Sequence, residues 1–258
     1  MKAEINGIEM KFEIHGLKNG PWITLSHSLA CNSHMWDGQI ETLGKYFQLL
    51  TYDTRGHGES SSAQPPYSFD MLGDDVFALL HHLGIKSTHF VGLSMGGMIG
   101  QSLSLKHPEV VNSLVLADTG HTASPQSVEQ WEKRIQLALD QGMDALVEPT
   151  LERWFNEPFR QARSKEYMAI SEQIRSTPVA GFVGCANALM NTNFTDRLKN
   201  IKSPSLAIAG EQDASAAATR YLGQHIPNAK TVIIPSAGHI SNVEQPKAFN
   251  QAVLNFLC

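Results

Sequence analysis

The chain has 258 residues, of which 42% are hydrophobic, and a formal net charge of −5; this size and composition fit one large α/β domain, or one with an inserted subdomain, and exclude a disordered chain. The charges are scattered without a Lys/Arg stripe, there is no signal peptide, and no apolar run approaches transmembrane length, so we expect neither nucleic acid nor a membrane as a partner. Three widely spaced cysteines, Cys31, Cys185 and Cys258, fit neither a disulfide framework nor a zinc site and indicate a cytoplasmic protein with reduced thiols.

Short apolar segments bounded by turn residues predict strands along most of the chain. The first two would form an antiparallel hairpin, because Asn6-Gly7 suits a two-residue turn. The predicted strands are residues 3–7, 10–14, 22–26, 48–52, 89–93, 113–117, 205–209 and 231–234.

Apolar residues at helical spacing predict helices between these strands. In the sheet region they are residues 69–83, 95–107 and 214–225, with a final helix from Pro246. From about residue 121 to 199 the helical patterns continue without a convincing strand. We therefore predict a doubly wound, mostly parallel sheet formed by residues 1–120 and 200–258, with residues 121–199 as a helical cap inserted after the sixth strand.

A G-x-S-x-G motif centred on Ser94 follows the predicted strand 89–93 and opens the next helix. This is the pattern of a nucleophile elbow, a sharp strand-to-helix turn that exposes the serine. Gly92 and Gly96 remove side chains that would collide at such a turn. Ser94 is therefore the candidate nucleophile.

A serine nucleophile needs a histidine base and a carboxylate that orients it, and after an elbow they follow in the order serine, acid, histidine. Asp213 lies just beyond the predicted strand 205–209, and His239 follows the strand 231–234. Both would lie at the carboxyl edge of the sheet, with Ser94. Asp118, at the end of the strand after the elbow helix, is the main alternative acid, and Glu211 is another.

An oxyanion hole needs two backbone N–H groups, one from the residue after the nucleophile and one from an early loop. Met95 and Leu29 occupy these places. We interpret His27, two residues before Leu29, as a histidine that stabilises this loop rather than as a catalytic group.

With these pieces in place, the chain resembles the α/β-hydrolase superfamily over its full length, and within it the 3-oxoadipate enol-lactonases. The resemblance implies the triad Ser94, Asp213 and His239, with Leu29 and Met95 forming the oxyanion hole and no metal or cofactor. The segments that carry it are Leu25–Leu29, Met35–Asp37, Tyr52–Gly58, Gly92–Met98, Leu151–Phe155 and Gly238–Pro246.

The activity that the resemblance implies is hydrolysis of 3-oxoadipate enol-lactone to 3-oxoadipate in the β-ketoadipate pathway of aromatic catabolism. Two segments depart from the lactonase pattern: His27 stands where those enzymes have asparagine, and Thr-Pro is missing after Asp213. A general carboxylesterase or perhydrolase acting on small esters is therefore the alternative, and a non-catalytic receptor on the same fold is a remote one. The partner expected is a small ester or lactone; the sequence leaves open whether the protein forms a homo-oligomer.

A lactone substrate with a free carboxylate would need a cation in the cap. Trp131 and Arg134 are three residues apart on a predicted helix, so their side chains share a face. An arginine there can hold a carboxylate through two parallel hydrogen bonds, although a solvated arginine is the plainer interpretation. With Trp154 from the cap segment that resembles the lactonases, these are the candidate substrate-binding residues.

Overall fold

The computed structural model describes residues 1–258 and contains one eight-stranded sheet in the order β1-β2-β4-β3-β5-β6-β7-β8. The strand pairs from β4 to β8 are parallel, and the β1–β2 and β2–β4 pairs are antiparallel. This confirms the predicted doubly wound, mostly parallel sheet. The strands are β1 Lys2–Ile5, β2 Ile8–Gly16, β3 Trp22–Ser26, β4 Gln48–Tyr52, β5 Thr88–Leu93, β6 Val111–Ala117, β7 Ser205–Gly210 and β8 Lys230–Ile234.

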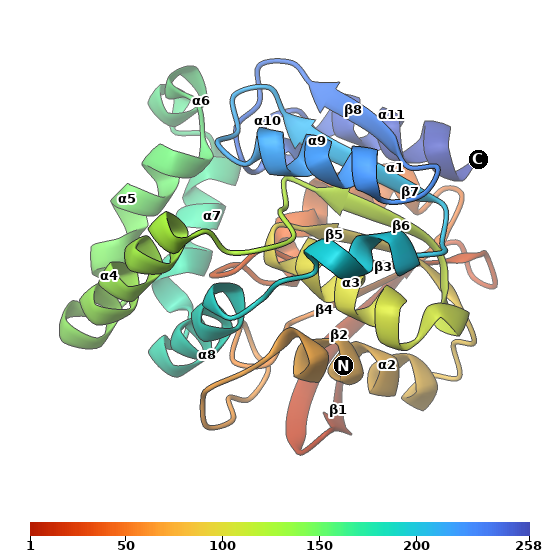
Figure 1. The fold of residues 1–258 in the computed structure, drawn as a ribbon, viewed down its shortest axis with the longest axis horizontal. Coiled ribbons are helices and arrows are strands. Elements are labelled where there is room, and N and C mark those ends of the chain that lie inside the picture. Colours follow the sequence, from red (N-terminus) through yellow and green to blue (C-terminus); the bar gives the residue numbers. More distant parts are fainter.

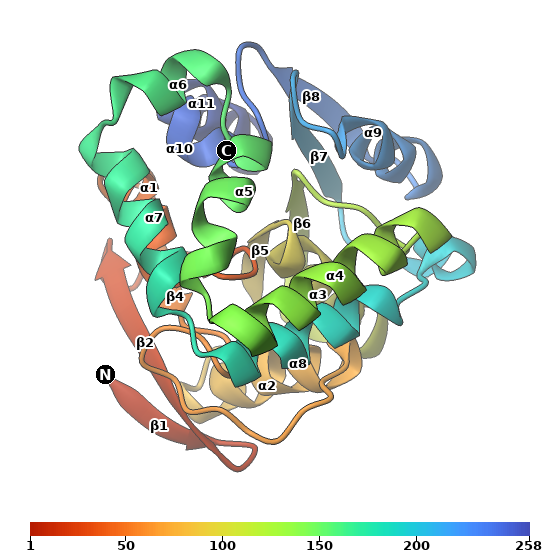
Figure 2. The same cartoon turned by 90° about the vertical axis from the view of Figure 1, so that its left-hand side faces the viewer.

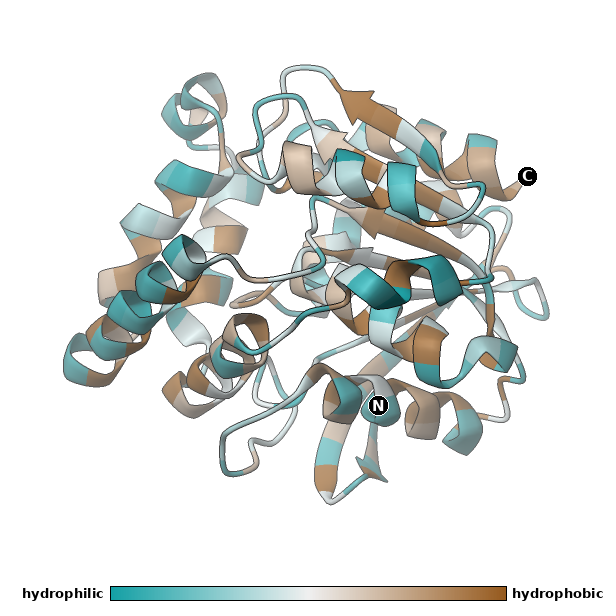
Figure 3. Ribbon diagram, viewed as in Figure 1, coloured by the Kyte–Doolittle hydropathy of each residue, from teal (hydrophilic) through white to brown (hydrophobic).

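Helices cover both faces of the sheet (Figure 1). Helices α1 and α11 pack against each other on one face, whereas α2, α3 and α9 cover the other. The strands between them are the most apolar part of the fold, and the helices turn polar residues outward (Figure 3). These helices are α1 Asp37–Leu43, α2 Phe69–His82, α3 Met95–Lys106, α9 Ala216–His225, α10 Ser241–Glu244 and α11 Pro246–Leu257.

The N-terminal hairpin forms where the sequence predicts it. Asn6 and Gly7 have φ values of 45° and 76°, and Ile5 pairs with Ile8 across the turn. Two central residues with positive φ are what a tight hairpin turn requires, and asparagine and glycine tolerate them best. The second strand is longer than expected, because its continuation to Gly16 pairs with β4.

Five helices between β6 and β7 form the cap, which lies beside the carboxyl edge of the sheet (Figure 2). The two chain segments that connect it to the sheet run side by side, joined by a β-bridge between Thr122 and Asn193. An insertion after the sixth strand is confirmed, and residues 121–199 stay our proposed extent for it. Its helices are α4 Pro125–Gln141, α5 Asp144–Trp154, α6 Glu157–Ala162, α7 Lys165–Ser176 and α8 Val179–Met190.

Two short helices, α1 and α10, were not expected from the sequence. Helix α10 has only four residues, too few for an apolar period to show. It begins two residues after His239 and connects the loop that carries this histidine to α11. None of the helices is both long enough and apolar enough to cross a membrane.

Candidate active site

Ser94 lies in the sharp turn between β5 and α3, with φ 55° and ψ −112°. The turn requires glycine on both sides: a Cβ on Gly92 would lie 2.2 Å from the carbonyl oxygen of Gly96, and one on Gly96 would lie 2.1 Å from that of Ser26. Such distances are far inside van der Waals contact. The predicted elbow is therefore present, with its serine in a conformation that is rare for residues other than glycine.

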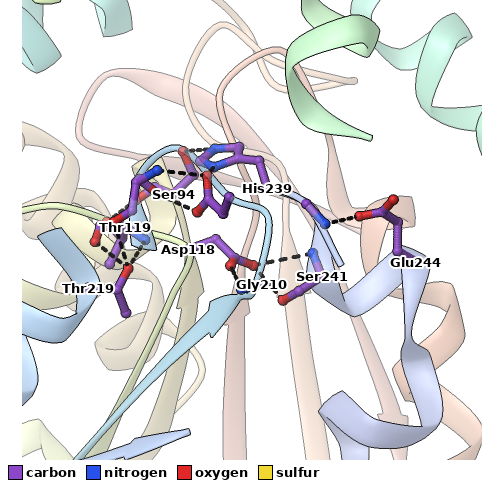
Figure 4. Close-up of polar contacts among 11 residues, drawn as sticks. Ser94, Asp118, Thr119, Gly210, Thr219, His239, Ser241 and Glu244 are labelled. Atoms are coloured by element: carbon purple, nitrogen blue, oxygen red, sulfur yellow. Dashed lines mark hydrogen bonds and ion pairs between the residues drawn. The ribbon is translucent and has the colours of Figure 1, made fainter. Parts of the chain in front are cut away.

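The structure brings Ser94, His239 and Asp213 together in one hydrogen-bonded chain. His239 Nε2 lies 2.9 Å from Ser94 Oγ (Figure 4). On its other side, His239 Nδ1 lies 3.0 Å from Asp213 Oδ1. The side chain of Asp213 is 2% exposed and that of His239 is 15% exposed. A buried acid behind a partly accessible imidazole is the arrangement that allows histidine to take a proton from serine.

The environment of Asp213 keeps it ionised. Burial alone would raise its pKa, but the adjacent His239 and hydrogen bonds from His239 and Ser215 outweigh burial and lower it. The N–H and hydroxyl of Ser215 both donate to this carboxylate. A charged Asp213 can stabilise the imidazolium that forms when His239 accepts a proton.

The alternative acids lie elsewhere. Asp118 is fully buried and accepts hydrogen bonds from the N–H of Gly210, at 2.7 Å, and from the N–H and hydroxyl of Ser241 (Figure 4). Burial, together with the nearby charge of Asp213, raises the pKa of Asp118 to about 7. Glu211 is exposed and accepts the N–H of Ser236. Neither carboxylate is hydrogen-bonded to His239.

The N–H groups of Leu29 and Met95 are buried, and neither donates to another group of the protein. Unpaired buried N–H groups are rare in proteins, and they are what an oxyanion hole requires. The assignment of these two amides as the oxyanion hole stays a proposal.

His27 fixes the loop that carries Leu29. Its Nε2 accepts the N–H of Thr54 at 2.9 Å, so Nδ1 carries the proton and donates to the Ser28 carbonyl at 2.7 Å. Burial lowers the pKa of His27, which favours this neutral form. Because C=O and N–H point in opposite directions in a trans peptide, this bond turns the Leu29 N–H away from His27. The contacts agree with a loop-stabilising histidine.

The cap residues predicted from the sequence lie in different surroundings. The guanidinium carbon of Arg134 lies 4.7 Å from the centre of the Trp131 ring, and both side chains are half-buried. Trp154 is only 3% exposed, and its ring centre lies 6.0 Å from that of His239. Trp154 therefore supports the histidine directly, and its contact with substrate stays a prediction.

Arg153 is a further candidate residue that the sequence analysis missed. Its guanidinium carbon lies 5.6 Å from the Trp131 ring, on which Arg134 also stacks. The side chain is exposed, and its pKa is lowered by the protein around it and by the nearby Arg134, with Asp213 acting in the opposite direction. The available signal was its place beside Trp154 in Leu151–Phe155, one of the segments that carry the resemblance to the lactonases.

Neither Arg134 nor Arg153 has a carboxylate within salt-bridge distance. Two positive charges without a counterion therefore meet at the Trp131 ring. No group of three or more His, Cys, Asp or Glu side chains is placed to hold a metal ion.

Comparison with known proteins agrees with this geometry. A family model described as the alpha/beta hydrolase fold matches residues 21–246. The chain belongs to this family. It is 36% identical over 248 residues to 3-oxoadipate enol-lactonase 2 of Acinetobacter baylyi, which covers 95% of this chain and 92% of that protein. The resemblance inferred from the sequence motifs is therefore confirmed.

Two further relatives show how wide the similarity is. The structure of an enol-lactonase from Burkholderia xenovorans LB400 superposes with a TM-score of 0.96 and 35% identity, covering 100% of this chain and 99% of that one. A putative carbamate hydrolase from Agrobacterium fabrum is 31% identical, covering 96% of this chain and 97% of that protein.

Replacing the two buried aspartates separates their roles. Asp213→Asn should lower kcat/KM by about 10⁴-fold, because an amide can hold the imidazole in the wrong tautomer. Asp118→Asn should lower it by at most about tenfold, since Asp118 has no bond to His239. Steady-state hydrolysis of an aryl ester measures both, and a reversed order of the two losses would make Asp118 the acid of the triad.

Asp118 should also make the stability depend on pH. Its pKa is raised from 3.8 to about 7, so between these values the folded protein binds more protons at this group than the unfolded chain. Its contribution to the unfolding free energy therefore falls as the pH rises from about 4 to 7, by at most about 1.4 kcal/mol per pH unit. Urea unfolding across this range should show that the difference in unfolding free energy between wild type and Asp118→Asn shrinks as the pH rises. A difference that stays constant with pH would contradict the prediction.

Proposed function

We propose that this protein is a serine hydrolase that opens a small lactone bearing a carboxylate, with 3-oxoadipate enol-lactone as the substrate and 3-oxoadipate as the product. The observation that carries the proposal is the pair of unpaired arginines, Arg134 and Arg153, that meets at the Trp131 ring of the cap, with Arg153 next in the chain to Trp154, whose ring lies beside that of His239. The enol-lactonases among its relatives support the same substrate.

In the first step Ser94 Oγ attacks the lactone carbonyl carbon while His239 Nε2 takes the hydroxyl proton. The carbonyl oxygen gains negative charge, which the N–H groups of Leu29 and Met95 stabilise. The ring C–O bond then breaks, and the proton on His239 passes to the departing enol oxygen. Because the substrate is a ring, the enol stays attached to the acyl group on Ser94, and it can tautomerise to the ketone.

In the second step His239 removes a proton from water, which attacks the acyl-enzyme. The bond between the acyl carbon and Ser94 Oγ breaks, and His239 returns the proton to Ser94. Asp213 stays ionised throughout, because its lowered pKa matches this role. These residues supply the nucleophile and both proton transfers by themselves.

The arginine pair provides the specificity. Two guanidinium groups at one aromatic ring repel each other when no anion is present, and each can hold a carboxylate with charge-assisted hydrogen bonds. A substrate with a carboxylate a few bonds from its reacting carbonyl would therefore be oriented as well as bound. A neutral ester would gain neither contact.

The triad alone would also attack a simple ester, so a general carboxylesterase or perhydrolase is the second candidate. Arg153 is exposed, has no carboxylate partner and shares the Trp131 ring with Arg134, and these contacts favour the anionic substrate over the neutral one. A receptor on the same fold would not need a hydrogen-bonded chain from Asp213 through His239 to Ser94. The presence of this chain favours an enzyme over a receptor.

Ser94→Ala should lower kcat about 10⁶-fold, because removing one member of a triad that acts as a unit abolishes its contribution. The measurement is hydrolysis of the enol-lactone together with labelling by a fluorophosphonate and mapping of the labelled peptide. Wild type should be labelled at Ser94 and the variant should not. Retention of more than a tenth of the activity would exclude Ser94 as the nucleophile, and an unreactive wild type would favour the receptor.

Arg153→Ala and Arg134→Ala should each lower kcat/KM for the enol-lactone about ten- to a hundredfold, the value of a hydrogen bond between charged groups. Neither should change hydrolysis of a neutral aryl ester by more than about threefold. Lys133→Ala removes an exposed charge from the same cap helix and serves as the matched control. Equal losses on both substrates would mean that the variants disturb the cap, and no loss on either would favour the general esterase.

A further inference from the structure

The loop that carries His239 is bonded to the cap as well as to the sheet. The N–H of His239 donates to the carbonyl of Trp154 at 2.7 Å. The side-chain amide of Asn156 donates to the carbonyl of Ser236 at 2.9 Å. Trp154 and Asn156 lie at the junction of α5 and α6, so a cap segment meets the main chain of this loop directly.

Glu244 stands between these two segments. One of its carboxylate oxygens accepts the N–H of Asn156 at 2.8 Å, and the other accepts the N–H of Gly238. Figure 4 shows Glu244 bonded to the loop next to His239. The carboxylate therefore accepts one bond from the cap and one from the residue that precedes the base.

The contact is close and buried. Glu244 is 8% exposed, and a Cβ on Gly238 would lie 2.4 Å from the Trp154 carbonyl oxygen and 3.1 Å from a Glu244 oxygen. No larger residue fits at position 238 while the cap segment stays in place. Burial raises the pKa of Glu244, with hydrogen bonds from Asn156 and Gly238 acting against it. A buried carboxylate without a cation is costly, so its two N–H partners are its main compensation.

Helix α10 explains why this residue can reach both segments. Glu244 is the last residue of α10, whose first residue, Ser241, is fixed to Asp118 in the core. The loop is thus held on one side by the buried Asp118 and on the other by Glu244.

We propose that Glu244 is a positioning residue that links the cap to the catalytic base, by holding the segment Trp154–Asn156 against the backbone at Gly238 and His239. It touches no substrate and acts through the position of the imidazole. The proposal rests on the proposed serine-hydrolase function.

The consequence for catalysis follows from geometry. His239 Nε2 is 2.9 Å from Ser94 Oγ, and a displacement of about 1 Å in such a contact can cost about a hundredfold in rate. Arg153, which we propose binds the carboxylate, is the residue next to Trp154. The segment that recognises the substrate is therefore the one that Glu244 fastens to the base.

Glu244→Gln tests the proposal, because it keeps the size of the side chain and replaces one acceptor with a donor that cannot accept an N–H. We expect kcat for an aryl ester to fall about ten- to a hundredfold, with KM changed by less than about threefold. The rate of fluorophosphonate labelling at Ser94 should fall by a similar factor, since it depends on the base and not on cap contacts. Glu211→Gln is the matched control: it makes the same change at an exposed glutamate that accepts the N–H of Ser236 in the same loop, and should alter each value by less than about twofold.

Asn156→Asp is a second variant for the case in which Glu244→Gln does not fold. It keeps the oxygen that accepts the N–H of Phe159 but loses the amide that donates to Ser236. We expect a fall of about three- to tenfold in kcat and in labelling rate, with near-wild-type circular dichroism and Tm.

Three outcomes for Glu244→Gln would overturn the linkage. The variant could fold and be labelled as fast as Glu211→Gln, or it could change KM alone. Its labelling rate could also fall only in proportion to the fraction of the protein that is unfolded. For Asn156→Asp, an unchanged labelling rate would do the same. If wild type itself is not labelled, the serine-hydrolase function fails first and the linkage fails with it. Labelled wild type with unaffected variants overturns the linkage alone.

Discussion

The reversal of the chain at Ser94, with φ 55° and ψ −112°, is the constraint on which the arrangement of the site depends. Strained backbone persists only where the surroundings fix it. Here the N–H of Ser94 donates to the carbonyl of Ala117 at 2.8 Å, and the hydroxyl of Thr119 donates to the carbonyl of Ser94 at 2.7 Å. Helix α3 can lie this close to the strands only because Gly96 carries no side chain. The end of β6 thus holds the nucleophile in place.

Two buried aspartates at neighbouring strand ends show how environment assigns their roles. Asp213 faces His239, and that partner lowers its pKa. Asp118 faces Gly210 and Ser241 instead, and burial raises its pKa. Two adjacent carboxylates could not both stay charged at little cost. Asp213 therefore supports the imidazole of His239, and Asp118 fixes the end of β7 to the loop that carries this histidine.

Much of the core could be predicted from the sequence because strand, turn and helix signals there agree with one another. Ser94, Asp213 and His239 each follow an apolar strand, so topology alone places them at one edge of the sheet. The choice between Asp213 and Asp118 could not be made in this way, because both satisfy the same rule. Arg153 was missed for a different reason: periodicity shows that a side chain leaves the core face of its helix, but not whether it meets solvent or another part of the chain.

In the function that we propose, the cap makes the site selective through charges left without partners. Elsewhere the molecule pairs its buried cations, as Arg55 is held by both oxygens of Asp75 at 2.7 and 2.8 Å. At Trp131 two arginines converge and neither has a carboxylate. Their mutual repulsion and the partial loss of water around Arg153 are reflected in its lowered pKa. A carboxylate bound between the two guanidinium groups would relieve both costs at once, which is the physical reason for proposing an anionic substrate.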